Sequence, residues 1–203
     1  FKALFDAKTL ISCSVLLALL LMMPQFLPRF YVYLFALMFA IALLATSLNL
    51  VLGFGGMYQF HHAVFYGFGA YAFALFATKS GLPLWIGYVI APFCSAALGL
   101  VLGLITVRLN RLYFGMLQIS LGSLVWAITY RWYSFTGGDD GIHGIPLPDL
   151  VGSSTGAYYF NLIVTATCLL LMYMIVNSPF GRIFQGIRDN PERCQAVGVN
   201  VQK

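Results

Sequence analysis

Residues 84–107 read LWIGYVIAPFCSAALGLVLGLITV, and this stretch contains no Asp, Glu, Lys or Arg. A helix needs about twenty apolar residues to cross the hydrocarbon core of a bilayer. The strands of a membrane barrel would instead alternate apolar and polar residues over about ten positions. The stretch therefore predicts a membrane-spanning helix. Ser95, Gly99 and Gly103 place small side chains on one of its faces, where a neighbouring helix can approach closely.

The composition of the whole chain agrees with this prediction. Its mean hydropathy is +0.87, and 8% of its residues are charged, whereas charged residues make up roughly a quarter of soluble domains. Comparable apolar runs occupy residues 9–27, 30–52, 60–78, 84–107, 112–135 and 158–176. We therefore expect an all-α membrane protein, a polytopic bundle of about six transmembrane helices that forms one domain over residues 1–203.

The basic residues predict how the chain is oriented. With the N-terminus in the cytoplasm, Arg29, Lys79 and Arg131 fall outside or near that face. The other basic residues fall inside: Lys2, Lys8, Arg108, Arg111, Arg182, Arg188, Arg193 and Lys203. This excess of positive charge on the cytoplasmic side is the usual bias of multi-pass membrane proteins. The net charge of +5 thus reflects orientation in a lipid bilayer, and nucleic acid is not an expected partner.

One interruption of the apolar pattern is polar but uncharged. Residues 48–71 read LNLVLGFGGMYQFHHAVFYGFGAY, and we call Gly53–Gly56 within them the glycine joint. A helix broken inside the membrane exposes backbone groups that can bind an ammonium or a carboxylate without a fixed charge. The alternative is that the glycines only permit close packing. The candidate residues for a translocation pathway are Asn49, Gly53, Gly55, Gly56, Gln59 and His62.

A second interruption, residues 178–200, reads SPFGRIFQGIRDNPERCQAVGVN. Pro179 suits the first position of a helix, and Phe180, Ile183, Phe184 and Ile187 then recur with helical spacing. Asn190 and Pro191 end this helix and begin another, which Gly198 ends. Such an amphipathic pair either lies on anionic lipid headgroups or fits a groove of a partner protein.

A third polar segment, TGGDDGIHGIP at residues 136–146, contains Asp139, Asp140 and His143. These side chains could hold a metal, but the segment lacks the spacing of a calcium loop, and we expect a solvated turn with no metal. The chain has no HExxH and no Walker sequence. We therefore expect no catalytic residue and no enzyme activity in this chain.

Four motifs together resemble the permeases of ABC importers, specifically the LivM-type permeases of the branched-chain amino acid transporter family. They are the glycine joint followed by HAVFYGFGAY, the basic turn VRLNRLYFGML, TGGDDGIHGIP and the 178–200 segment, and the resemblance covers roughly residues 47–201. It implies that residues 178–200 form the cytoplasmic coupling loop. The implied ATPase-coupling residues are Phe180, Gly181, Arg182, Ile183, Phe184, Ile187, Arg188, Asn190, Glu192, Ala196 and Gly198. The implied outer mouth is Thr136, Gly137, Gly138 and Asp139.

The resemblance also implies a function. The chain would be the N-terminal portion of a permease for branched-chain or other hydrophobic amino acids in the bacterial cytoplasmic (inner) membrane. Partner ATPase subunits would carry ATP and magnesium and drive alternating access, and this chain would hold no cofactor. A second homologous permease subunit and an extracytoplasmic substrate-binding protein would complete the transporter. A urea or short-amide permease, a passive channel and a secondary carrier are the alternatives. Gln59 and His61 depart from the family pattern, which His62 matches, so the substrate stays open.

Overall fold

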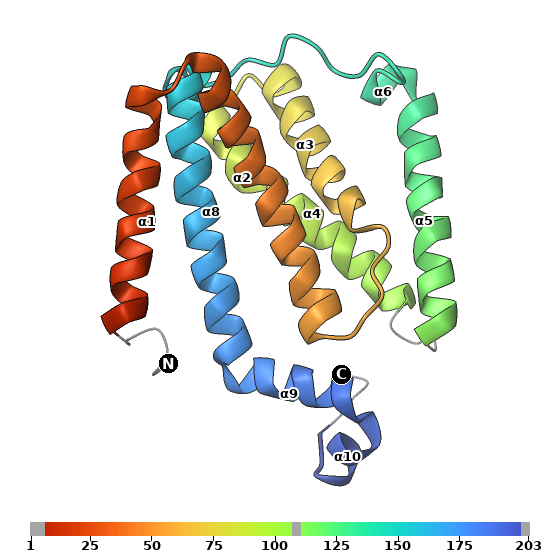
Figure 1. Cartoon of the computed structure of the whole chain (residues 1–203). Helices are drawn as coiled ribbons and strands as arrows, with labels where there is room; N and C mark the ends of the chain where they lie inside the picture. The colour runs from red at the N-terminus through yellow and green to blue at the C-terminus, as the bar shows by residue number, and fades with distance from the viewer. Residues whose placement is uncertain (1–6, 107–110, 200–203) are drawn as a thin grey trace. The chain divides into compact units, whose positions relative to one another are not determined.

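The structure is a computed structural model that describes residues 7–106 and 111–199. Every regular element within these residues is a helix, which confirms the predicted all-α fold. The long helices are α1 (Ala7–Phe26), α2 (Arg29–Asn49), α3 (His62–Lys79), α4 (Leu84–Thr106), α5 (Arg111–Arg131) and α8 (Ser154–Asn177) (Figure 1). The shorter ones are the π-helix η1 (Leu50–Phe54), α6 (Tyr133–Thr136), α7 (Asp149–Gly152), α9 (Pro179–Asp189) and α10 (Pro191–Ala196).

Each apolar run of the sequence overlaps one long helix. By length and composition, three helical stretches of the described residues can cross a membrane: Arg29–Phe54, Leu84–Thr106 and Ser154–Asn177. The helices also leave large apolar side chains exposed; Leu104 is 66% exposed and Ile163 is 64% exposed. Such surfaces suit lipid or neighbouring apolar helices. The chain is thus an all-α membrane protein, and about six crossings remain a prediction.

Two helix boundaries differ from the prediction for local reasons. The run at 112–135 is divided, because α5 ends at Arg131 and Trp132 has the non-helical angles φ −89° and ψ 68° before α6 begins. The helix expected from residue 158 begins earlier, because the Ser153 side chain accepts a hydrogen bond from the Gly156 amide and caps α8. The basic turn at Arg108 falls outside the described residues, as do Lys2 and Lys203.

The chain divides into two compact units, and each is described by itself. The first comprises residues 1–47 and 149–182 and contains α1, most of α2, α7 and α8. Its core joins Val32 and Ala36 of α2 to Tyr158 and Leu162 of α8. The Asn161 side chain of α8 also donates a hydrogen bond of 3.2 Å to the Ala36 carbonyl of α2. Both apolar and polar contacts therefore fix α8 against α2.

One tyrosine of the first unit compensates for a proline in α1, and a second binds the next carbonyl of that helix. Pro24 has no N–H, so the helix leaves the Leu20 carbonyl without its usual backbone donor. The Tyr158 hydroxyl donates to that carbonyl at 2.6 Å, and the Tyr159 hydroxyl donates to the Leu21 carbonyl at 3.0 Å. Unpaired backbone groups cost several kcal/mol in lipid. These two bonds therefore stabilise the interrupted helix and hold α8 to it.

The second unit comprises residues 48–148 and 183–203, and the pairing of α3 with α4 dominates it. The Ser95 hydroxyl of α4 donates to the Phe65 carbonyl of α3 at 3.0 Å. A Cβ atom at Gly99 would lie 3.5 Å from the Phe65 ring, in ordinary contact. The predicted small-residue face is therefore confirmed at Ser95 and Gly99. A Cβ at Gly103 would meet no described atom within 4 Å.

Candidate functional site

Helix α2 continues into the π-helix η1, which ends at Phe54 within the glycine joint. After η1 the Gly56 amide bonds the Leu52 carbonyl at 3.1 Å, and the Met57 amide bonds the Val51 carbonyl at 3.2 Å. Gly56 has φ +67°, a left-handed conformation that glycine adopts without strain and that commonly ends helices. Regular structure resumes at His62 with α3. The broken helix predicted from the sequence is therefore confirmed.

The candidate pathway residues form two polar pairs. The Asn49 side chain lies against Gly53, where its amide group occupies the space of a missing Cβ. The Gln59 side chain lies 3.1 Å from Nδ1 of His62. Neither pair carries a fixed charge at neutral pH, so both can offer dipoles to a zwitterionic solute. The role of these residues in a pathway stays a prediction.

The glycine joint also contacts the C-terminal half of α9, which belongs to the same unit. The Phe184 ring lies against Gly55, and the aliphatic part of the Arg188 side chain lies against Gly56. Nη1 of Arg188 donates a hydrogen bond of 2.5 Å to the Gly53 carbonyl, and Nη2 forms an ion pair of 2.8 Å with Asp189. Two groups of predicted site residues, from the pathway and from the coupling loop, are thus in direct contact.

The segment predicted to form the coupling loop has the two helices that its sequence predicts. α9 begins at Pro179, and Asn190 caps α10 by accepting a hydrogen bond of 3.0 Å from the Arg193 amide. Gly198 follows α10 with φ +85°, as expected of a glycine after the last turn. The amphipathic helix pair is therefore confirmed over the described residues 178–199.

The apolar residues of the coupling helices differ in exposure. Phe180 is 67% exposed, Ile183 is 44% exposed and Val197 of the following turn is 81% exposed, whereas Phe184 and Ile187 are half-buried. Arg182, Glu192 and Ala196 are exposed as well. Large exposed apolar side chains beside charged ones are typical of a surface that binds another protein.

Gly181 places the start of α9 close to the end of α8 within the first unit. It is buried, and a Cβ atom there would overlap the carbonyl oxygens of Ile175 and Val176. Because these are backbone atoms, no side-chain movement can make room for a larger residue. Gly181 is therefore required for the close turn between the two helices.

The segment predicted to form the outer mouth is ordered by side chains. The Thr136 hydroxyl donates to the carbonyls of Thr129 and Trp132 at 2.6 and 2.8 Å, and the Tyr133 hydroxyl bonds the Asp139 carboxylate at 2.5 Å. Gly137 and Gly138 have φ +80° and +60°. Asp139 thus has a tyrosine partner, and the segment is a fixed turn. Its position at an outer mouth stays a prediction.

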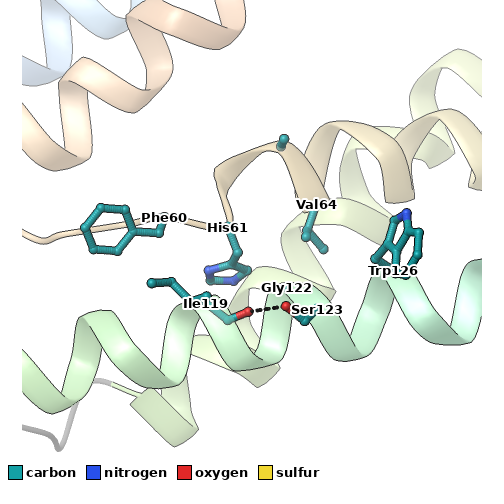
Figure 2. Close-up of a pocket in the computed structure, with 8 residues that line it drawn as sticks. Phe60, His61, Val64, Ile119, Gly122, Ser123 and Trp126 are labelled. Carbon is teal, nitrogen blue, oxygen red and sulfur yellow. Dashed lines mark hydrogen bonds between the residues drawn. The ribbon is translucent and has the colours of Figure 1, made fainter.

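A pocket of 330 Å³ lies between helix α5 and the first turn of α3 with the two residues before it, and the sequence did not predict it. One side of the pocket is lined by Phe60, His61, Ala63 and Val64 (Figure 2). The other side is lined by four residues of α5: Ile119, Gly122, Ser123 and Trp126. Gly122 permits this approach, since a Cβ there would lie 2.9 Å from that of His61. The family pattern had directed attention to His62, and nothing in the sequence placed α5 opposite His61.

His61 is the buried polar group of this pocket. Its side chain is 5% exposed, and within the described residues neither ring nitrogen has a hydrogen-bond partner. Within the same described residues, the side-chain oxygen of Gln118 in α5 is also buried without a hydrogen-bond partner. Buried polar groups are usually paired with protein, water or ligand. His61 of this pocket, and Gln118 of α5, are therefore further candidates for mutational testing.

Comparison with known proteins finds a family model described as the permease component of the branched-chain amino acid transport system, which matches residues 30–203. The chain is 27% identical to the high-affinity branched-chain amino acid transport system permease protein LivM of Escherichia coli K12, over 79% of this chain and 44% of that protein. The LivM protein of Salmonella typhimurium LT2 is 26% identical over 78% of this chain and 44% of that protein.

A third relative is the probable branched-chain amino acid transport permease protein LivM of Methanocaldococcus jannaschii, which is 26% identical over 57% of this chain and 35% of that protein. The chain therefore spans less than half the length of the curated relatives it matches. No solved structure matches the chain.

Proposed function

Because the chain belongs to the family of branched-chain amino acid transport permeases, we propose that it forms part of the membrane-spanning subunit of an ATP-driven importer. The importer would lie in the bacterial inner membrane and cross it several times, with the N-terminus in the cytoplasm. The coupling helix pair α9–α10 carries this proposal. Its sequence-defined caps and its exposed apolar residues suit docking to an ATPase that this chain does not contain.

The proposed substrates are branched-chain or other hydrophobic amino acids. Two relatives are permeases of branched-chain amino acid transport systems, which supports this class, as does the uncharged character of the candidate pathway residues. Asn49, Gln59 and His62 can bind the ammonium and carboxylate of an amino acid through hydrogen bonds. Because these side chains carry no fixed charge, release of the zwitterion leaves no unpaired ion in the pathway.

The proposed mechanism is alternating access without chemistry on the substrate. Closure of the partner ATPase dimer would move α9 and α10, and the attached helices would then change which side of the membrane the pathway faces. A second permease subunit would form the other wall of the pathway, and an extracytoplasmic binding protein would deliver the substrate to the turn at Thr136–Asp139. ATP and magnesium would bind the partner subunits.

The test uses the full-length permease, its ATPase subunits and its binding protein reconstituted in vesicles. We expect uptake of labelled leucine that requires ATP, and competition by isoleucine and valine but not by urea or acetamide. Val197→Asp should reduce the amount of ATPase that co-purifies, because it places a charge on the exposed docking surface. Leucine uptake that continues without ATP would contradict the proposal and indicate a channel or carrier.

A further inference from the structure

Helix α9 presents different side chains to two different environments. Phe184 and Arg188 are one helical turn apart and therefore lie on the same face. Both contact the glycine joint. Ile183, in contrast, is 44% exposed, and Arg182 is exposed as well. Phe184 and Arg188 therefore make contacts within the permease, although the Arg188 side chain is itself 40% exposed. Arg182 and Ile183 are accessible to a partner protein.

The contact at Gly55 leaves no room for a larger side chain at that position. A Cβ atom at this position would overlap the Phe184 ring and would lie 2.6 Å from the Val51 carbonyl oxygen. The aromatic ring thus occupies the space that any other residue at position 55 would need. Because aromatic rings and backbone are stiff, a displacement of α9 must either move the joint or break this contact.

The contact of Arg188 adds a directional bond. Gly53 lies in the last turn of η1, where carbonyl groups have no helical donor ahead of them. The Arg188 guanidinium donates to its carbonyl, and positive charge is favoured at the C-terminal end of a helix. Arg188 also bonds Asp189, which holds the guanidinium in place. Arg188 therefore acts as a capping side chain for η1 that comes from the coupling helix.

We propose that Phe184 and Arg188 are positioning residues that transmit movement of the coupling helix directly to the glycine joint. This route is additional to the covalent connection of α9 to α8. It rests on the proposed function, because it assumes that an ATPase moves α9. The joint is suited to receive the movement, since Gly56 at φ +67° ends a helix and such points absorb backbone rotation.

The first test compares two arginines of the same helix in the reconstituted transporter. Arg188→Met keeps the aliphatic stem and removes the donors, and we expect the ATPase to remain bound while leucine uptake per ATP hydrolysed falls about tenfold. Arg188→Lys keeps a donor and should recover part of this ratio. Arg182→Met should instead weaken ATPase binding without changing the ratio in the complexes that remain.

The second test separates the contact from the strain of the backbone. Gly56 and Gly81 both have positive φ, +67° and +63°, but only Gly56 lies against Arg188; a Cβ at Gly81 would meet no described atom within 4 Å. Gly56→Ala should lower uptake per ATP as Arg188→Met does, whereas Gly81→Ala should preserve the ratio. Equal losses in both variants would mean that strain alone acts, and would overturn the proposal.

The third test observes the joint itself. A nitroxide is attached to Leu52→Cys, a position that is 40% exposed, in a permease whose native cysteines are all replaced by alanine. Binding of a non-hydrolysable ATP analogue to the ATPase should change the nitroxide spectrum, and Arg188→Met should abolish that change. An unchanged spectrum in the parent complex would overturn the direct route. If the proposed function itself were wrong, the parent complex would instead show no ATP-dependent leucine uptake, so the two failures can be distinguished.

Discussion

Pro24 removes one backbone donor from α1, and a buried side chain from another helix replaces it. Tyr158 is 0% exposed, so its hydroxyl has no access to water. The hydroxyl therefore needs an acceptor and the Leu20 carbonyl needs a donor, and the bond between them satisfies both groups. Its ring also packs edge-on against Phe39, with the ring centroids 5.3 Å apart. One tyrosine thus pairs a backbone group and fills the core of the first unit.

This pairing predicts the result of a double-mutant cycle. Tyr158→Phe should lower the free energy of unfolding by about 1–3 kcal/mol, because it leaves the Leu20 carbonyl buried without a donor. Pro24→Ala restores an N–H at position 24, so Tyr158→Phe should cost less in that background. Unfolding in a mixed-micelle denaturant titration measures all four proteins. Equal losses with and without Pro24 would show that the hydroxyl does not compensate for the proline.

At the scale of elements, residues of the local sequence determine where α9 and α10 begin and end. Pro179 occupies the start of α9, Asn190 caps α10, and Gly198 follows it, all within one or two turns of the groups they satisfy. The ends of α9 and α10 are therefore defined by residues of this chain. Gly186 of α9 also lies close to α10, because a Cβ there would lie 3.2 Å from the Cys194 sulfur.

The Asn190 cap can be tested by hydrogen exchange. Asn190→Ala should destabilise the first turn of α10 by about 1 kcal/mol and speed exchange at the Arg193 amide, because that amide loses its acceptor. Ser153→Ala is the matched control: it removes the corresponding cap of α8 and should affect the Gly156 amide alone. Unchanged exchange at Arg193 would mean that packing rather than the cap orders α10.

At the scale of the whole molecule, the family match over residues 30–203 makes the chain part of a transport permease. Substrate, ATPase and binding protein are properties of the complete transporter and stay proposals, because the chain spans 44% of the Escherichia coli relative. The orientation of the chain is likewise a proposal, and it rests on the distribution of the basic residues.

Cysteine labelling tests this orientation. In a cysteine-free background, a membrane-impermeant reagent should label Asp140→Cys in intact cells, and Gln195→Cys only after the membrane is opened. Both residues are exposed, so access to the reagent depends on the side of the membrane alone. The opposite pattern would invert the predicted topology and would exclude α10 from contact with a cytoplasmic ATPase.

The sequence by itself determined the long helices, the break at the glycine joint and the two coupling helices. Apolar runs, prolines and caps act over a few residues, so their effects can be predicted without knowing the rest of the fold. The end of α5 and the start of α8 were predicted less accurately, because the bend at Trp132 and the cap at Ser153 have weak sequence signals.

Only the tertiary structure decided which side chains meet. The bond from Tyr158 to Leu20 joins residues 138 positions apart, and the bond from Arg188 to Gly53 joins residues 135 apart. Helical spacing grouped Phe180 and Phe184 in one apolar ridge, yet Phe184 contacts the joint while Phe180 is 67% exposed. Periodicity defines the faces of a helix, but the neighbour of each face depends on how distant segments pack.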